Sequence, residues 1–449
     1  MPEEPSPSKW RELAQWRQSA LVRGIGAALL VLLLQIPVAF ISSAIDERRV
    51  TKDAAVADVT RSWAGAQELA GPILTISSIE RSQDSDGKAH QRTVVKRFLP
   101  RTLSVRGRAD IEVRRRGIFD VPLFVAQLHV EGSFAVPDVT RFAAKPQDIL
   151  WQEATLAVGV SDPRGIRAAS PLSMGSRRIP FGPGAENAKF LGTGLHAAVP
   201  DLQPGSEVPF AFDLTMAGSG RLTFVPMGDE TTVALTSPWP DPSFDGAWLP
   251  RERKVGATGF DSTWRVLNLG RNFASSWDAT ETDLSREALS AAAFGVTLLS
   301  PVDTYRTNAR AVKYQLLFLG LTFTAFALFE LLARLRVHPF QYLLVGLALI
   351  LFYLLLLSLS EQTGFARAYA IAAAMVVGLV TMYVRFVLTR WSRALSIGTL
   401  LGALYGFLFV LLQIQDYALL VGSLGLFVVL AAIMWVTRRV NWYEICRPS

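Results

Sequence analysis

The stretch "FQYLLVGLALILFYLLLLSL", residues 340–359, runs for twenty positions without a charged side chain. A helix of this length measures about 30 Å, which matches the hydrocarbon core of a bilayer. A soluble helix as long as this normally keeps a charged face toward water. The stretch therefore predicts a membrane-spanning helix, and we expect an integral membrane protein.

The same pattern recurs at both ends of the chain, whereas charged residues are spread through its middle. We expect six transmembrane helices, at residues 24–45, 314–332, 340–359, 368–387, 394–412 and 417–436. The last five helices form a predicted bundle over residues 314–436, and residues 46–313 form a large domain inserted between the first helix and the second. Terminal tails at residues 1–23 and 437–449 complete this organisation.

The first apolar run is also similar to a secretory signal peptide. Ser42 and Ala44 have the small-x-small spacing of a cleavage site. The apolar part, residues 24–41, is longer than a signal peptide normally has, so we expect it to remain as an anchor. Pro37 should bend this helix, because proline cannot donate to the backbone ladder.

Basic residues predict the orientation of the helices, since they concentrate in cytoplasmic flanks. They gather before the first helix, between the second and third, between the fourth and fifth, and after the sixth: Lys9, Arg11, Arg17, Arg23, Arg334, Arg336, Arg390, Arg393, Arg438, Arg439 and Arg447. The short loops on the opposite side contain Arg367 alone. We therefore expect both termini in the cytoplasm and residues 46–313 on the far side of the membrane.

The overall charge does not indicate a nucleic-acid partner. The formal net charge is +7, but residues 46–313 contain 32 Lys plus Arg against 31 Asp plus Glu. The excess thus lies in the membrane flanks, where it sets topology. The single cysteine, Cys446, lies in the predicted cytoplasmic tail, so the exported domain must be held together by its core without a disulfide.

The exported domain has the pattern of a mainly antiparallel β fold. Residues 92–136 alternate apolar and polar side chains around a turn at Arg116-Gly117, which predicts two strands joined by a hairpin. Shorter strand-like runs follow at residues 155–160, 209–216, 222–225 and 232–236. One helix is expected at residues 284–294, before the strand-like "GVTLLSP".

The sequence contains no pattern that predicts catalysis, a cofactor or a metal. The histidines of the exported domain have no ligand-like spacing, and no cysteine lies near them. No phosphate-binding loop, nucleophile elbow or acyl-enzyme motif is present. We therefore expect no catalytic residue, no cofactor and no metal site, and the chain is not expected to be an enzyme.

The stretch "SPWPDPSFDGAWLP", residues 237–250, concentrates Pro, Trp and Gly. It is a candidate binding loop for a ring-shaped ligand or a peptide. The alternative, which we favour, is a rigid connection in which Trp239 and Trp248 fill the core, because large aromatic side chains dominate core burial.

Glu330 is the only acidic residue inside a predicted transmembrane helix, which makes it a functional candidate. It precedes Arg334 by four residues, the favourable order for a helical ion pair, and we favour an interfacial pair over a proton relay. His338, in the same connection, is a further candidate functional or structural position.

Glu361 lies just beyond the third predicted helix, in a loop expected to close around Gly364. Ser360 or Thr363 is expected to cap the next helix, with Glu361 near its positive end. The alternative is that Glu361 and Arg367 dock the exported domain onto the bundle. We favour the structural turn.

Small residues repeat every four positions in the fourth and fifth predicted helices, at Ala370, Ala374 and Gly378 and at Gly398, Gly402 and Gly406. Such stripes allow close helix packing, and we expect packing here rather than a pore. No predicted helix carries the charged or polar interior stripe that an ion path requires.

Residues 326–365, "FALFELLARLRVHPFQYLLVGLALILFYLLLLSLSEQTGF", resemble the signature of the CreD family of bacterial inner membrane proteins, also described as colicin-tolerance or cell-envelope-integrity proteins. The resemblance extends to "AGPIL" (70–74), "SDPRGI" (161–166), "SPWPDPSFDGAWLP" (237–250), "LGRNF" (269–273) and "VDTYRTNARAVKY" (302–314). It implies a multi-pass inner-membrane protein with a periplasmic domain that supports envelope integrity and tolerance of envelope stress.

Two functions remain open at this point, and a cell-wall enzyme of unfamiliar type is a third, weaker possibility. The favoured one is a non-enzymatic envelope protein whose partners are the lipid bilayer and, through residues 46–313, an envelope protein or wall component. The alternative is a transporter or channel-like protein in which the exported domain captures a ligand. The sequence leaves the oligomeric state open.

Overall fold

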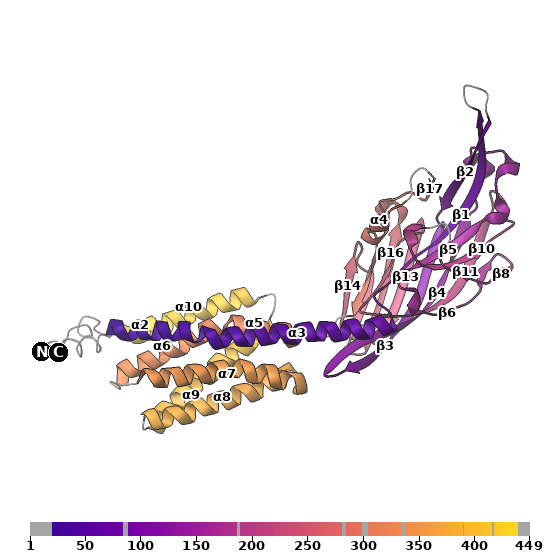
Figure 1. The fold of residues 1–449 in the computed structure, drawn as a ribbon. Helices are drawn as coiled ribbons and strands as arrows, with labels where there is room; N and C mark the ends of the chain where they lie inside the picture. Colours follow the sequence, from indigo (N-terminus) through magenta and orange to yellow (C-terminus); the bar gives the residue numbers. More distant parts are fainter. Residues whose placement is uncertain are drawn as a thin grey trace, which may run out of the picture. The chain divides into compact units, whose positions relative to one another are not determined.

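The computed structural model describes residues 20–83, 89–185, 189–280, 284–298, 304–333, 338–388, 390–414 and 417–438. The chain forms two compact units, one made of Met1–Lys52 with Val302–Ser449 and the other of Asp53–Pro301. The first unit is helical and the second is built mainly from strands (Figure 1). We call them the helical unit and the β unit.

The helical unit is built from long apolar helices and one short polar helix. Its helices are α2 (Ala20–Leu33), α3 (Gln35–Trp63, whose end belongs to the β unit), α5 (Thr304–Lys313), α6 (Gln315–Ala333), α7 (Pro339–Thr363), α8 (Phe365–Leu388), α9 (Trp391–Gln413) and α10 (Ala418–Thr437). Within the described residues, five helices are long and apolar enough to cross a membrane, or six if the bent pair α5–α6 is one span. These five to six apolar helices agree with the expectation of a membrane protein from the apolar runs of the sequence.

Two interruptions separate helices that follow each other in the chain. Leu34 divides α2 from α3, three residues before Pro37, whose missing N–H leaves the carbonyl of Leu33 without its helical donor. Between α5 and α6 the chain bends by 43°. The expected second span began after this bend, because α5 is amphipathic and carries Arg306, Arg310 and Lys313.

Helix α7 lies at the centre of the packing in the helical unit. It contacts α5, α6 and α8, and Gly346 lets Leu34 and Phe323 approach its backbone. Phe352 packs against two tyrosines, with ring centroids 5.2 Å from Tyr369 and 4.6 Å from Tyr405. These contacts connect α7, α8 and α9 by dispersion forces, as expected for helices in lipid.

The small-residue stripes do not form the packing faces that the sequence predicted. Gly398 is buried and lies against Thr381, but Gly402 and Gly406 are exposed. On α8, the stripe of Ala370, Ala374 and Gly378 is exposed as well, and the buried face contains other residues: Phe365, Ala368, Tyr369, Ala372, Val376, Val380 and Val384. Among these described glycines, Gly398 has a close neighbour, whereas Gly378, Gly402 and Gly406 have none within 4 Å, so the predicted packing was wrong at these three positions within the chain.

In its described residues, the β unit contains two nine-stranded sheets. The first contains β1 (Gln67–Gln83), β2 (Ala89–Phe98), β5 (Thr155–Val160), β9 (Gly182–Pro183), β10 (Gly194–Ala198), β12 (Arg221–Phe224), β14 (Pro242–Gly246), β17 (Ser276–Asp278) and β18 (Phe294–Leu298). The second contains β3 (Thr102–Arg116), β4 (Phe119–Ala135), β6 (Ile166–Ala169), β7 (Leu172–Met174), β8 (Arg177–Ile179), β11 (Glu207–Ser219), β13 (Glu230–Ser237), β15 (Glu252–Gly256) and β16 (Gly259–Leu267). Short helices, among them α4 (Arg286–Ala291), connect the strands.

Most ladders between the described strands are antiparallel, but β1 pairs with β12 and β3 pairs with β13 in parallel. The unit is therefore mixed. The chain passes from the second sheet at β11 to the first sheet at β12 and back to the second at β13. Strands β12 and β13 therefore pair with β1 and β3, which are distant in the chain and are not joined to them by hairpins.

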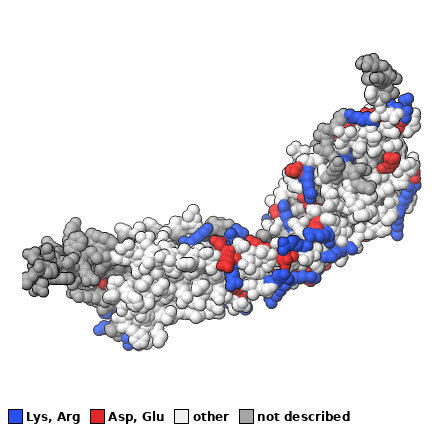
Figure 2. Space-filling view, in the orientation of Figure 1, with Lys and Arg blue, Asp and Glu red and all other residues white. Residues whose placement is uncertain are grey.

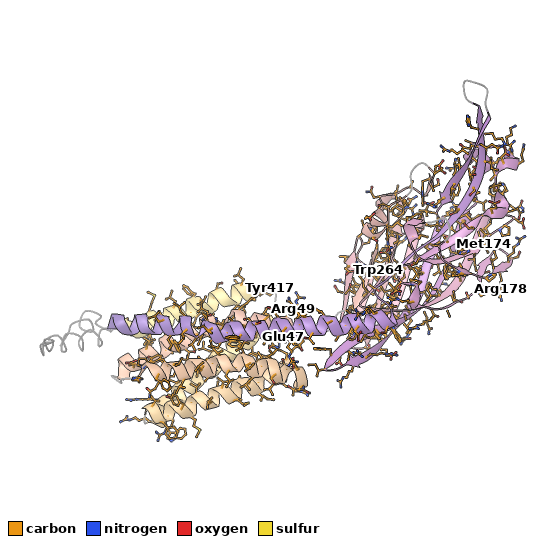
Figure 3. All side chains as sticks on the ribbon, viewed as in Figure 1. Glu47, Arg49, Met174, Arg178, Trp264 and Tyr417 are labelled. Carbon is orange, nitrogen blue, oxygen red and sulfur yellow. The ribbon has the colours of Figure 1, made fainter. Side chains whose placement is uncertain are left out.

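The predicted hairpin is confirmed. Strands β3 and β4 pair from Thr102↔Ser133 to Arg116↔Phe119, and Gly117 in the turn has a φ of 63°, which glycine adopts without strain. Inward residues of both sheets form one hydrophobic core. Trp264, labelled in Figure 3, is fully buried in this core. Because the β unit contains no cysteine, the packing of this core must stabilise it without a disulfide.

The two units differ in the distribution of charged residues on their surfaces. The described surface of the helical unit is mostly uncharged in Figure 2, with Lys, Arg, Asp and Glu near its ends. The face of the β unit seen in Figure 2 carries groups of Lys and Arg as well as Asp and Glu. This distribution suits a membrane for the first unit and water for the second.

Candidate functional site

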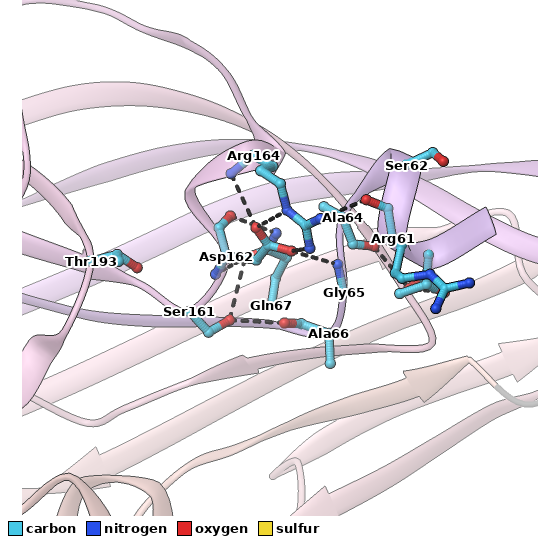
Figure 4. Close-up of polar contacts among 12 residues, drawn as sticks. Arg61, Ser62, Ala64, Gly65, Ala66, Gln67, Ser161, Asp162, Arg164 and Thr193 are labelled. Carbon is cyan, nitrogen blue, oxygen red and sulfur yellow. Dashed lines mark hydrogen bonds and ion pairs between the residues drawn. The ribbon is translucent and has the colours of Figure 1, made fainter. Parts of the chain in front are cut away.

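The loop with the sequence "SDPRGI" (161–166) binds the end of helix α3 within the β unit (Figure 4). The carboxylate of Asp162 accepts hydrogen bonds from the backbone N–H of Gly65 at 2.9 Å and from the guanidinium of Arg164 at 2.7 Å. Arg164 also donates to the carbonyl of Arg61 in the last turn of α3. These bonds, with Arg164 first, lower the pKa of Asp162 to about 2, so the carboxylate stays charged at neutral pH.

The last residue of α3 is held by stacking. The guanidinium of Arg114, on β3, lies 4.4 Å from the centre of the indole ring of Trp63. The guanidinium of Arg167, on β6, lies 4.6 Å from the same ring. Arg116 forms an ion pair with Asp58 one turn earlier in α3. The end of α3 is therefore fixed to β3, β6 and the 161–166 loop.

The stretch "LGRNF" (269–273) supplies a buried cation. The guanidinium of Arg271 donates to the carbonyls of Met227 at 2.7 Å and Gly228 at 2.8 Å, and it lies 3.4 Å from the carboxylate of Asp229. Burial lowers the pKa of Arg271. The side chain binds successive carbonyls in the chain before β13, which is a structural role.

Trp239 and Trp248 are half-buried and pack on the hydrophobic core. The indole N–H of Trp239 donates to the carbonyl of Asp241, and the ring of Trp248 meets Phe294 edge-on at 6.0 Å. Both side chains thus contribute to the core, as the favoured interpretation of their loop expects, and their role in binding stays a prediction.

The second sheet also carries a polar network and two shallow hollows. The ring of His129 lies 2.7 Å from Asp213 and 3.3 Å from Glu131, and the hydrogen bond to Asp213 is the main cause that raises its pKa. One hollow, of about 470 Å³, is lined by Arg108 and Lys254 among others. The other, of about 410 Å³, is lined by Glu131, Ser133 and Ser173 among others.

Glu361 lies in the last turn of α7 rather than in a loop. Its carboxylate accepts a hydrogen bond of 2.9 Å from the hydroxyl of Tyr305 on α5 and forms an ion pair of 3.7 Å with Arg48 on α3. Its side chain is only 12% exposed. The carboxylate therefore connects three helices of the helical unit.

The expected loop after residue 359 is reduced to one residue, Gly364, between α7 and α8. No helix breaker precedes Gly364, whose φ of 79° ends the helix. Ser360 and Thr363 donate back to the carbonyls of Leu357 and Leu359 in α7, so the expectation that they cap α8 was wrong. The side chain of Arg367 is exposed.

Glu330 accepts a hydrogen bond of 3.0 Å from the hydroxyl of Tyr342 on α7. The expected partner Arg334 lies outside the described residues. His338 begins α7: its ring accepts from the N–H of Phe340, and the side chain of Gln341 accepts from the N–H of His338. His338 thus acts as a helix cap before Pro339.

The inner face of α5 and α6 carries polar side chains that sequence reasoning missed. Asn308 donates to Ser360 at 2.9 Å, and Gln315 donates to Gln35 at 2.6 Å. Thr322 follows seven positions later and is 2% exposed. The expectation that no helix carries a polar interior stripe was therefore wrong. Asn308 lies outside the predicted span at residues 314–332, so the seven-residue spacing of 308, 315 and 322 was not recognised.

Within the described residues, no group of three or more His, Cys, Asp or Glu side chains has a geometry that could hold a metal ion. The clusters around Asp162, Arg271 and Glu361 are made of ion pairs and hydrogen bonds to carbonyls and hydroxyls. Their evident effect is to position helices and loops.

Solved structures with a similar shape share too little with this chain to carry an argument. An M1 zinc metallopeptidase mutant from Deinococcus radiodurans is 12% identical, with a TM-score of 0.19 over 37% of this chain and 38% of that chain. A putative protease from Parabacteroides distasonis is 10% identical, with a TM-score of 0.18 over 61% of this chain and 55% of that chain.

Comparison of sequences is decisive. The family model described as "Inner membrane protein CreD" matches residues 19–443. The inner membrane protein CreD of Escherichia coli K12 is 34% identical over 442 residues, covering 97% of this chain and 95% of that protein. These matches agree with the apolar helices and with the segments quoted above, and the chain belongs to the CreD family of inner membrane proteins.

Proposed function

We propose that this inner-membrane protein supports the integrity of the cell envelope and its tolerance of stress through the β unit, without catalysing a reaction. The observation that carries the proposal is the order of the chain. The β unit, Asp53–Pro301, lies in sequence between one long apolar helix and the remaining apolar helices. A large water-compatible unit inserted in this way suits a protein that presents a surface next to the membrane.

The proposed orientation places both termini in the cytoplasm and the β unit in the periplasm. It rests on the basic flanks, which lie before the first helix and after the last, and on the near-neutral charge of residues 46–313. The contacts of Asp162 and Trp63 would hold the end of α3 in a fixed position next to β1, the first strand of the exported unit.

The partner of the β unit is proposed to be an envelope protein or a component of the cell wall. The two hollows of the second sheet are the places where such a partner would bind, because concave surfaces with convergent polar groups are the usual binding sites. In-cell photo-crosslinking tests this directly. A photoreactive residue at Ser173, which lines one hollow, should capture the partner, whereas the same residue at the exposed Gly117 of the β3–β4 turn should not.

Gene deletion tests the envelope role. Cells without the protein should become more sensitive to detergent, to antibiotics that act on the envelope and to colicins. The wild-type chain should restore the original response. Unchanged responses to all three treatments would remove the support for this function.

A further inference from the structure

We propose that helices α5 and α6 line a gated path for protons between Glu361 and Glu330. The proposal does not depend on the envelope role described above. It starts from one face of these two helices, which carries Tyr305, Asn308, Gln315, Thr322 and Glu330. Polar groups buried among transmembrane helices are rare and commonly mark an ion or proton pathway.

A carboxylate and a phenol form a pair at each end of this face. Tyr305 donates to Glu361 at 2.9 Å at one end, and Tyr342 donates to Glu330 at 3.0 Å at the other. Positions 305 and 330 would be about 37 Å apart along a straight helix, and the 43° bend between α5 and α6 shortens this distance toward the thickness of the hydrocarbon core. Each pair thus lies where a proton can be exchanged with water.

Three side chains between these pairs have a polar atom that lacks a hydrogen-bond partner among the described residues. These atoms are Asn308 Oδ1, Gln315 Oε1 and Thr322 Oγ1. The three side chains are 1%, 6% and 2% exposed. An unpaired polar atom in an apolar interior is unfavourable, and such atoms usually bind water.

The spacing of these atoms sets the length of each step. Neighbouring positions are two helical turns, or about 10 Å, apart, which three or four hydrogen-bonded water molecules bridge. Leu319 and Phe326 lie buried on the same face. These side chains must move before a continuous chain of water forms, so we expect a slow, gated flux rather than an open pore.

The proton balance of the path is simple. Glu361 takes up a proton at one end, the proton passes along the water molecules held by Asn308, Gln315 and Thr322, and Glu330 releases a proton at the other end. No covalent bond changes, and the driving force is the proton gradient.

The test uses the full-length protein in liposomes that contain a pH-sensitive dye. A pH step is imposed, and valinomycin with potassium removes the membrane potential that would oppose the flux. Wild-type protein should dissipate the gradient faster than protein-free liposomes. Glu361→Gln and Glu330→Gln should each reduce the rate to that of protein-free liposomes, whereas Glu47→Gln, at an exposed position on α3, should retain the wild-type rate.

A matched pair of threonines separates proton flux from helix packing. Thr322→Val removes a buried hydroxyl from the proposed path, and Thr324→Val removes an exposed hydroxyl that bonds to Gly320 on the same helix. Thr322→Val should lose most of the flux, and Thr324→Val should retain it, with both variants matching wild type in size-exclusion profile and helix content. Wild-type flux equal to that of protein-free liposomes, or equal flux in the two threonine variants, would overturn the proposal.

Discussion

The carboxylate of Glu361 accepts a hydrogen bond from the hydroxyl of Tyr305, although the two residues are 56 positions apart in the chain. The bond joins the last turn of α7 to the polar helix α5, and Ser360 repeats the connection by accepting from Asn308. A carboxylate that ends an apolar helix is thus held by side chains of the helical unit itself. This arrangement makes α5 part of the membrane unit rather than a linker.

Tyr305→Phe should loosen α5 while preserving its packing. The ring remains, but the buried carboxylate of Glu361 loses a donor, which typically costs about 1–3 kcal/mol. We expect faster hydrogen exchange in α5 and at the end of α7, measured by mass spectrometry in detergent. Tyr417→Phe, at an exposed position, is the matched control and should leave exchange unchanged. Equal exchange in the Tyr305 variant and wild type would show that the bond does not hold α5.

Asp162→Asn should destabilise the β unit and remove part of its dependence on pH. Because the pKa of Asp162 falls from 3.8 to about 2 in the folded chain, the charged carboxylate stabilises the fold by about 2 kcal/mol above pH 4. That contribution is lost as the pH falls from about 4 toward 2. Urea unfolding followed by tryptophan fluorescence at neutral and acidic pH measures it.

The control for this experiment is Asp110→Asn, which removes a carboxylate from an exposed pair with Arg108. Exposed pairs contribute little, so this variant should unfold almost like wild type. If both variants shift the urea midpoint equally at neutral pH, the bonds around Asp162 are not what holds the end of α3.

Asp213→Asn should lower the pKa of His129. The raised pKa depends first on the hydrogen bond to Asp213, and Glu131 adds to it. Since the folded-state pKa lies above the ordinary value, the charged imidazole stabilises the fold below pH 6.5, and this contribution disappears as the pH rises through the folded-state pKa. Titration of the four histidines by NMR should show one resonance moving to lower pKa in the variant. An unchanged titration would mean that Asp213 does not interact with His129 in solution.

Gly364→Val should reduce the amount of folded protein in the membrane. Gly364 has a φ of 79°, which a β-branched residue adopts only with strain, and no other atom blocks the added side chain. Gly402→Val is a matched control, since Gly402 also has open space around it but lies within helix α9. Comparable membrane levels for the two variants would contradict the importance of this backbone conformation.

Local pattern was sufficient to predict some parts of this structure. The hairpin β3–β4 alternates over most of its length, and strand β5 coincides with the expected run 155–160, so their residues were predicted correctly, and the apolar runs predicted the membrane helices. Strand β1 was not expected, because Gly71-Pro72 interrupts its alternation and the register shifts there. Helix α5 was missed because its polar face hides the buried positions Tyr305 and Asn308.

The candidate sites depended on contacts between distant residues, which single-sequence patterns do not contain. Asp162 is recognisable as a helix cap before Pro163, but its bond to Gly65 requires the folded sheet. Glu361 was identified as a candidate from its place at the end of an apolar run, whereas Tyr305 and Arg48 as its partners follow only from the packing of α3, α5 and α7.

The measurement that tests the central claim most directly is the accessibility of single cysteines in spheroplasts. Cys446 is the only natural cysteine, so the wild-type chain reports the C-terminal tail, and a Cys446→Ser chain with Lys254→Cys reports the exposed strand β15 of the β unit. A maleimide that does not cross membranes should label the Lys254→Cys chain in intact spheroplasts and should label Cys446 only after the membrane is opened. Labelling of Cys446 in intact spheroplasts, with Lys254→Cys protected until lysis, would contradict an exported β unit.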